Sequence, residues 1–243
     1  MQEPEKPADR FDAVETNWSL IREACRDTTV HAAPARAALV VRYLPAISRY
    51  VAAIVKDEAA SQDLTQDVCA RLMNGDFSGA DQERGRFRDY LKTAVRNIAR
   101  NHWRQEKRRS ASPLPESLAE DSPNEDAWVV AWRGNVLDMT WRAMDAWERK
   151  TPGAIGSQLL RLRASMPNDS MEKIAAGLEQ VAGELLKPNA IRTQLHRARS
   201  RFAQFLLAEV TRTLKEPTEQ QLQEELAALG LLEYLPKQSN AVD

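Results

Sequence analysis

The residues in this sequence whose types are best suited to binding chemistry are arginines and lysines that crowd into one short stretch. Between Arg84 and Arg109 the chain carries ten basic residues and only two acidic ones. The formal net charge of the whole protein is only -1, so this excess is local. A local positive field attracts anions even when the total charge is near zero.

The same stretch has the pattern of a long amphipathic helix with aromatic residues beside the cations. We predict that Leu91, Val95, Ile98 and Trp103 turn inward and that polar side chains turn outward. Cations hold phosphates, amides reach base edges and rings stack on unpaired bases, so this face favours nucleic acid. An ordinary solvated basic helix stays open as the alternative. The nucleic-acid candidates are Phe87, Tyr90, Arg96, Asn97, Arg100, Asn101 and Arg104.

A second basic excess lies in the carboxy-terminal half, where residues 187–212 hold six basic residues and one acidic one. We expect a short helix begun by Ser170, an intervening segment, and a basic helix opened by Pro188. This order is that of a helix-turn-helix, in which the start of the second helix meets the major groove. Other amphipathic helix pairs give the same pattern. The candidates at that start are Arg192, Thr193, Gln194, His196 and Arg197.

The other elements are also expected to be helices, because helical periodicity dominates and no convincing strand alternation competes with it. Residues 35–55 predict a core helix in which Pro45 bends or restarts the chain. Residues 60–75 predict a second helix, capped by Ser61 and stopped by Gly75. Its apolar face has Leu64, Val68 and Leu72, and its exposed stripe, which a merely solvated face would also explain, is Asp63, Gln66, Asp67 and Arg71.

Composition limits the class of protein. The chain has 243 residues, of which 43% are hydrophobic, enough for one large domain or two small ones. Cys25 and Cys69 have no metal-ligand spacing, so we expect buried thiols in a reducing compartment and neither a metal nor a cofactor. No eighteen apolar residues run together, which favours a soluble cytoplasmic protein with no membrane insertion.

In their order, these segments resemble bacterial sigma factors of the sigma-70 family. The similarity is to the extracytoplasmic-function (ECF) group, and within it to the long planctomycete-like branch. It is carried mainly by "DLTQDVCARLM" (63–73), "RGRFRDYLKTAVRNIARNHWRQEKRR" (84–109) and "NAIRTQLHRARSRFAQFLLAEV" (189–210). The segment 179–187, "EQVAGELLK", is longer than the tight turn typical of this family, which leaves the geometry of the second basic helix open.

The resemblance implies an all-α fold of two small helical domains joined by a flexible acidic linker. In that family, region 2 binds core RNA polymerase and opens the minus-ten element, and region 4 reads the minus-thirty-five element. The implied organisation is a leader (1–15), region 2 (16–110), the linker (111–127), region 4 (128–215) and a carboxy-terminal extension (216–243).

The same resemblance implies roles for the candidate residues. The stripe of Asp63, Gln66, Asp67 and Arg71 corresponds to the polymerase-binding face. Asn97 and Asn101 correspond to residues that meet minus-ten DNA, with Arg100 and Arg104 on phosphates. The loop 79–87 corresponds to one that captures an extruded base, and residues 192–197 to the minus-thirty-five reader. The expected protein is a non-enzymatic sigma factor whose partners are core RNA polymerase and promoter DNA, with room for an anti-sigma factor or another regulator.

Three alternatives stay open. A helix-turn-helix regulator that is not a polymerase subunit would explain the second basic segment only. A nuclease built on Asp63, Asp67 and Asp81 would need carboxylates that converge on a metal. A pure interaction protein would keep the fold without binding promoters. The extension, with leucines at 222, 226, 229 and 232, is expected either to fold back on its own domain or to dock on a partner.

Overall fold

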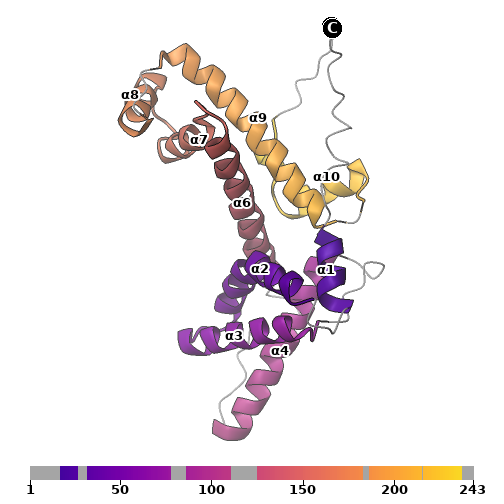
Figure 1. Ribbon diagram of the computed structural model, residues 1–243. Coiled ribbons are helices and arrows are strands. Elements are labelled where there is room, and N and C mark those ends of the chain that lie inside the picture. Colours follow the sequence, from indigo (N-terminus) through magenta and orange to yellow (C-terminus); the bar gives the residue numbers. More distant parts are fainter. Residues whose placement is uncertain are drawn as a thin grey trace. The chain divides into compact units, whose positions relative to one another are not determined.

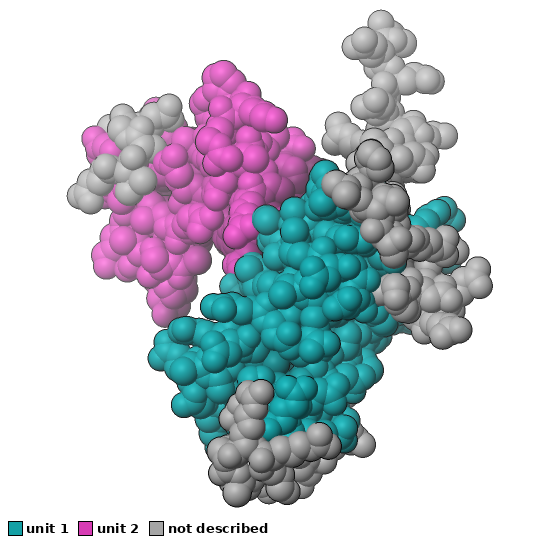
Figure 2. Space-filling model, turned by 60° about the horizontal axis from the view of Figure 1, so that its bottom comes forward, with its two compact units in different colours: residues 1–135, 210–229 teal, residues 136–209, 230–243 magenta. Residues whose placement is uncertain are grey.

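The structure, a computed structural model, describes residues 17–26, 32–77, 86–110, 125–182, 186–214 and 216–236. These residues form nine α-helices and one short 3-10 helix, with no β-strand among them (Figure 1). The all-helical prediction is therefore confirmed for the described part of the chain. The chain divides into two compact units, coloured teal and magenta in Figure 2: unit 1 has residues 1–135 and 210–229, and unit 2 has residues 136–209 and 230–243.

Unit 1 is built around α2, whose apolar side is buried against its neighbours. Helix α2 packs against α1 and α3, and α3 packs against α4. Leu39 and Ile47 of α2, Leu64 of α3 and Leu91 of α4 are almost completely buried in this core. The helices of unit 1 are α1 (Asn17–Arg26), α2 (Ala33–Ile54), α3 (Glu58–Asn74), α4 (Phe87–Ser110), the start of α6 (Glu125–Lys150), the end of α9 (Pro188–Arg212) and α10 (Glu219–Ala228).

Helix α2 runs without interruption through Pro45, so of the two predicted effects, a bend or a restart, the restart is wrong. A proline removes one backbone donor from a helix interior and crowds the preceding turn. Burial of apolar side chains before and after Pro45, among them Leu39 and Ile47, offsets that cost. By length and composition α2 could also cross a membrane, with a mean hydropathy of 1.3 over 18 residues, but a buried core helix passes the same test.

The ends of α3 show which local signals fixed its position. Asp57 is the N-cap, and its side chain accepts a hydrogen bond from the Ala60 backbone N–H at 2.8 Å. The prediction of Ser61 as the cap is wrong, because Ser61 lies one turn inside the helix and is buried. At the other end Gly75 takes φ 81°, in the left-handed region, as its role as a stop predicted. A Cβ there would also lie 2.7 Å from Nη2 of Arg36.

The start of α6 contributes two tryptophans to the core of unit 1. Trp132 stacks on Tyr43 with centroids 5.3 Å apart and an interplanar angle of 9°. Trp128 meets Tyr50 edge-on at 5.0 Å. Residues 125–135 thus group with unit 1, whereas the sequence placed a flexible linker up to residue 127 and a second domain from residue 128. The rest of that linker, 111–124, lies outside the described residues.

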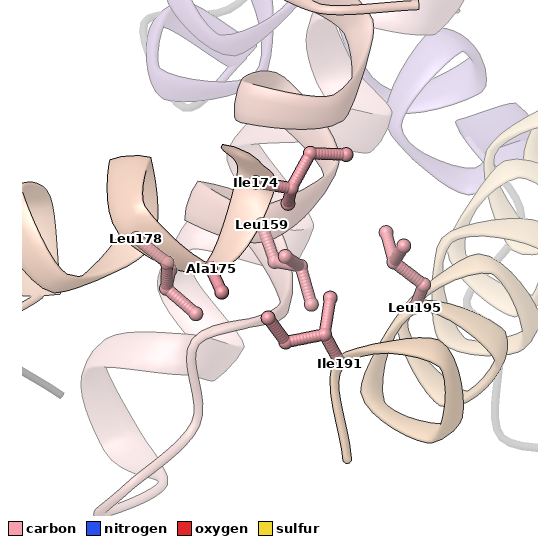
Figure 3. Close-up of a cluster of buried hydrophobic side chains, with 6 residues drawn as sticks. All are labelled: Leu159, Ile174, Ala175, Leu178, Ile191 and Leu195. Carbon is pink, nitrogen blue, oxygen red and sulfur yellow. The ribbon is translucent and has the colours of Figure 1, made fainter. Parts of the chain in front are cut away.

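Unit 2 contains the remainder of α6, α7 (Gly156–Ser165), α8 (Met171–Ala182), most of α9 and the 3-10 helix η4 (Leu232–Tyr234). Figure 3 shows the aliphatic cluster that joins α7, α8 and the start of α9. A second cluster, Met144, Ala198 and Phe202, packs against Trp141 of α6. The two clusters fix one side of α9 and leave its other side to solvent. The residues of the first cluster are Leu159, Ile174, Ala175, Leu178, Ile191 and Leu195.

Candidate functional site

The stripe predicted on α3 is on the outside of unit 1. Asp63 and Gln66 are exposed, and the side chains of Asp67 and Arg71 are 40% and 41% exposed. Asp67 and Arg71 form an ion pair across one helical turn, with Nε and Oδ1 3.1 Å apart. The opposite side of α3 buries Leu64, Val68 and Leu72, as predicted. The polar side chains of the stripe are therefore accessible to a partner, and none of them packs in the core.

The outward face of α4 lies in the second half of the helix. Asn97, Asn101 and Arg104 are exposed, and Arg96 and Arg100 are half-buried. The other side of the helix is anchored by Leu91, Val95 and Ile98, which are buried as predicted. Two amides one turn apart thus project from a helix whose position is fixed by its core residues.

The two aromatic residues predicted to contact DNA at the start of α4 differ in exposure. Phe87 is 2% exposed and lies 5.1 Å from the ring of Tyr43, so the interpretation of Phe87 as a base-stacking ring is wrong. Its ring completes the core where α4 meets α2. Tyr90 is half-buried and meets Phe77 edge-on at 6.3 Å. In the loop proposed for base capture, residues 79–85 lie outside the described residues.

Two arginines of the basic stretch contact the carboxy-terminal helix α10. Arg86 Nη1 lies 2.7 Å from Oε2 of Glu225, and Arg88 Nη1 lies 3.1 Å from Oε1 of the same carboxylate. Glu225 is 1% exposed, and burial raises its pKa although the two arginines partly offset that rise. Helix α10 is thus part of unit 1.

The sequence analysis missed this contact and considered only the leucines of the extension. A usable signal was present in the spacing. Glu225 stands three residues after Leu222 and one before Leu226, on the apolar side of α10. A carboxylate at such a position needs a cationic partner inside the fold, because an unpaired buried charge is costly.

The start of α9 presents the residues predicted for base recognition. Arg192, Thr193, His196 and Arg197 are exposed, and Gln194 is half-buried. The Nη1 of Arg192 donates to the Asn189 Oδ1 at 2.8 Å, and the Thr193 hydroxyl donates to the Asn189 carbonyl at 3.2 Å. The preceding helix α8 ends at Ala182, so the first residues of the segment 179–187 extend that helix. Residues 183–185 lie outside the described residues.

A groove of about 390 Å³ in unit 2 adjoins these residues. Arg201 lines it with its guanidinium carbon 4.9 Å from the centroid of the Trp147 ring. The sequence analysis did not single out Arg201 or Trp147. Arg201 follows Arg197 by one helical turn, so the two arginines lie on the same side of α9. This spacing could have predicted that the cationic face continues to Arg201. The groove is lined by Trp147, Ala154, Ile155, Gly156, Gln194, His196, Arg197, Ala198, Ser200, Arg201 and Gln204.

Acidic residues of α6 hold the first turn of α7, which in turn packs against α9. The Glu148 carboxylate accepts a hydrogen bond from the Ser157 backbone N–H at 3.0 Å. Asp145 accepts a hydrogen bond from the Ser157 hydroxyl and pairs with Arg161 at 3.0 Å. Burial, followed by the nearby charge of Asp145, raises the pKa of Glu148 above its ordinary value. This network places Leu159 in the cluster that seats α9.

Within the described ranges, no three His, Cys, Asp or Glu side chains gather in a way that could hold a metal ion. Asp81, which the nuclease alternative needs, lies outside those ranges. Burial raises the pKa of the Cys25 thiol to about 11, with Arg36 partly opposing the rise, so this thiol stays protonated. Cys69 is only half-buried, and burial raises its pKa as well.

Comparison with known proteins gives one match. Residues 39–109 match the Sigma-70 region 2 family, and this span includes the α3 stripe and the exposed face of α4. No curated protein and no solved structure matches the chain. Sigma factors are not enzymes, and they are generally cytoplasmic. Residues 39–109 thus resemble a sigma-70 region 2 domain, which in sigma factors implies binding to core RNA polymerase.

Proposed function

We propose that this protein is an ECF sigma factor of the planctomycete-like branch that works in the cytoplasm. In this proposal α3 binds core RNA polymerase, α4 contacts the minus-ten element as it opens, and the start of α9 reads the minus-thirty-five element. The observation that carries the proposal is the placement of two exposed polar faces, on α3 and α4, within the region 2 match.

The case for α3 as the polymerase-binding face rests on exposure. Asp63, Gln66, Asp67 and Arg71 form a continuous outward stripe whose removal would leave the apolar side of α3 untouched. Exposed ion pairs such as that between Asp67 and Arg71 contribute little to folding. Charged groups at an interface set the association rate and the choice of partner.

The case for α4 as the minus-ten face rests on chemistry and rigidity. Side-chain amides can bond base edges, and Asn97 and Asn101 are both exposed. Arg104 adds an exposed cation suited to a phosphate on the same half of the helix. Because Leu91 and Val95 fix the opposite side in the core, the amides keep a constant orientation during DNA contact.

The case for unit 2 as the upstream reader rests on three packed helices. The start of α9 is seated on α7 and α8 by Ile191 and Leu195, and its exposed side carries Arg192 and Arg197. A helix-turn-helix presents its second helix in this way. Arg201, which lines the adjoining groove, adds a further cation that suits the DNA backbone.

The decisive experiment reverses charge on the α3 stripe. The double variant Asp63→Lys with Asp67→Lys should weaken capture of core polymerase by tenfold or more, about 1.4 kcal/mol. Its helicity should equal that of the wild type, since these side chains lie outside the core. A matched control is Glu219→Lys with Glu224→Lys, which makes the same charge change at two exposed positions of α10.

Polymerase capture equal to that of the control would remove α3 from the proposed interface. Failure of the wild-type protein to capture core polymerase at all would overturn the sigma-factor proposal. In that case, binding of duplex DNA through α9 alone would favour the helix-turn-helix regulator.

A further inference from the structure

The contact between α10 and the start of α4 has the chemistry of an anion-binding site that is already filled. Arg86 and Arg88 approach opposite oxygens of the Glu225 carboxylate, at 2.7 Å and 3.1 Å. Both arginines flank Phe87, the first residue of α4, and the amino end of a helix favours negative charge. Two guanidinium groups around two oxygens is also how proteins hold a phosphate.

The filled site is not optimally bonded. Among the described residues, Nε and Nη1 of Arg88 and Oε2 of Glu225 have no hydrogen bond of good geometry, although the charges are in contact. A buried ion pair gains little over desolvation unless such hydrogen bonds are made. Burial raises the pKa of Glu225 more than the arginines lower it. The ion pairs therefore do not fully offset the cost of burying the charged carboxylate.

The arginines differ in how closely they are covered. The side chain of Arg86 is 36% exposed, whereas that of Arg88 is 10% exposed. An incoming anion could therefore meet Arg86 first and reach Arg88 only after α10 has moved. The apolar residues that hold α10, Leu226 and Leu229, are buried, so the helix stays in place when no competing anion is present.

We propose that Arg86 and Arg88 form a phosphate-binding site for single-stranded DNA, and that Glu225 of α10 occupies this site in the free protein. DNA and α10 then compete for the same two guanidinium groups. The inference extends the DNA-binding role proposed for α4 and rests on it. Its test, however, needs neither polymerase nor a promoter sequence.

The test measures binding of the free, full-length protein to a fluorescent (dT)20 oligonucleotide, which offers phosphates without a promoter. Glu225→Lys should expel α10 by repulsion from the arginines. The control, Glu224→Lys, makes the same charge change at the neighbouring exposed position. Two added phosphate contacts should steepen the salt dependence of log K by about 1.4 relative to the control, so the gain in affinity shrinks about sevenfold between 50 and 200 mM salt.

Two further variants separate the causes. Arg86→Gln added to Glu225→Lys should remove about half of the added salt dependence, because one guanidinium is lost. Leu229→Ser should release α10 by removing a buried apolar side chain, without changing net charge, and should give the same gain in affinity. This variant keeps the test valid if Glu225→Lys lowers the helicity of the whole protein.

Competition also predicts a reciprocal effect in the wild type. Saturating (dT)20 should speed hydrogen exchange of the backbone amides of residues 219–229, because each ligand weakens binding of the other. Suppose that hydrogen exchange in α10 is faster in Glu225→Lys than in Glu224→Lys, but that both variants bind (dT)20 with equal affinity. The uncovered arginines would then bind no phosphate. Unchanged exchange on DNA addition would show that the two do not compete. Either result overturns the proposal, while the Asn97 and Asn101 role could still stand.

Discussion

The two long basic helices, α4 and α9, carry the exposed residues predicted to contact DNA at opposite ends. In α4 Phe87 and Arg88 of the first turn are buried in unit 1, although Asp89 and Thr93 are exposed, and the exposed amides Asn97 and Asn101 come later. In α9 the first turns carry exposed Arg192 and Arg197, and the later turns bury one side, with Phe202 and Leu206. Both helices are similar in length, 24 and 25 residues, and similar in chemistry.

The difference shows that the core, rather than the density of charge, decides where a basic helix can meet DNA. The first turns of α4 are covered because Phe87 packs on Tyr43 and because Glu225 lies against Arg86 and Arg88. The first turns of α9 are open because its aliphatic contacts, Ile191 and Leu195, lie on one side only. The comparison predicts which substitutions act through folding and which act through DNA.

The largest effects should come from the residues that anchor each helix. Leu91→Ala in α4 and Leu195→Ala in α9 each leave a cavity in a packed core, so each should cost about 2 to 5 kcal/mol of stability. Urea unfolding, followed by hydrogen exchange within each unit, would assign each loss to its own unit. A loss below about 1 kcal/mol at either site would mean that the helix is not held as described.

The next largest effect concerns strand opening. Replacing Asn97 and Asn101 by Ala should reduce opening of a cognate promoter more than it reduces polymerase binding, with about 1 to 3 kcal/mol for each lost base contact. Permanganate reactivity of the opened bases measures this directly. Gln105→Ala, at an exposed position further along α4, serves as the control. Wild-type reactivity in the Asn double variant would show that the exposed half of α4 is not the opening face.

Substitutions at the start of α9 should affect only recognition of the upstream promoter element. Arg192→Ala with Arg197→Ala should depress transcription from duplex promoters, each base-specific contact being worth roughly 1 to 3 kcal/mol. Holoenzyme binding of a single-stranded minus-ten oligonucleotide should be spared. Arg199→Ala provides an exposed control on the same helix. Equal loss in both assays would make this end of α9 structural, and no loss in either would mean that it does not face DNA.

The smallest effect is a dependence on pH in the support of α9. The folded state raises the pKa of Glu148 by burial, so the stability that its protonated form contributes is present at low pH and is lost as the pH rises through the folded pKa. Wild type should therefore gain stability relative to Glu148→Gln as the pH falls from 7 to 4.

Glu172 on α8 gives the control of opposite sign. Hydrogen bonds from its own backbone N–H and from the Ser170 hydroxyl lower its pKa, so its contribution is lost on acidification. Relative to Glu172→Gln, the wild type should therefore lose stability over the same pH range. Urea unfolding of all three proteins measures both differences. If both stability differences changed in the same direction as the pH falls, the assigned burial of Glu148 would be contradicted.

Periodicity in the sequence was sufficient to predict α2, α3, α4 and α9 and their apolar faces. Leu64, Val68 and Leu72 of α3, and Ile191, Leu195 and Phe202 of α9, are buried as their spacing indicated. The α3 stripe and the amides of α4 are exposed for the same reason, because whatever lies opposite an apolar face points outward. Their roles in binding remain proposals.

Contacts between distant segments could not be predicted in this way. Phe87 is an aromatic residue in a basic segment, which is typical of a ring that stacks on bases. Only its position beside Tyr43 shows that it belongs to the core. Trp128 and Trp132 stand next to an acidic segment that predicted a linker, yet their rings fill unit 1. Local periodicity carries no information about a partner far away in the chain, and that partner determined the burial of each of these residues.

The contact between Glu225 and Arg86 also fixes an order of events during protein synthesis. The two residues are about 140 positions apart, so unit 1 closes this contact only by a long loop. A ribosome releases α1 to α4 well before α10, and long-range contacts form slowly. Every newly made chain thus passes through a stage in which α4 is complete and its first two arginines are still uncovered. If these arginines bind nucleic acid, the nascent protein has its strongest affinity for it before α10 has been made.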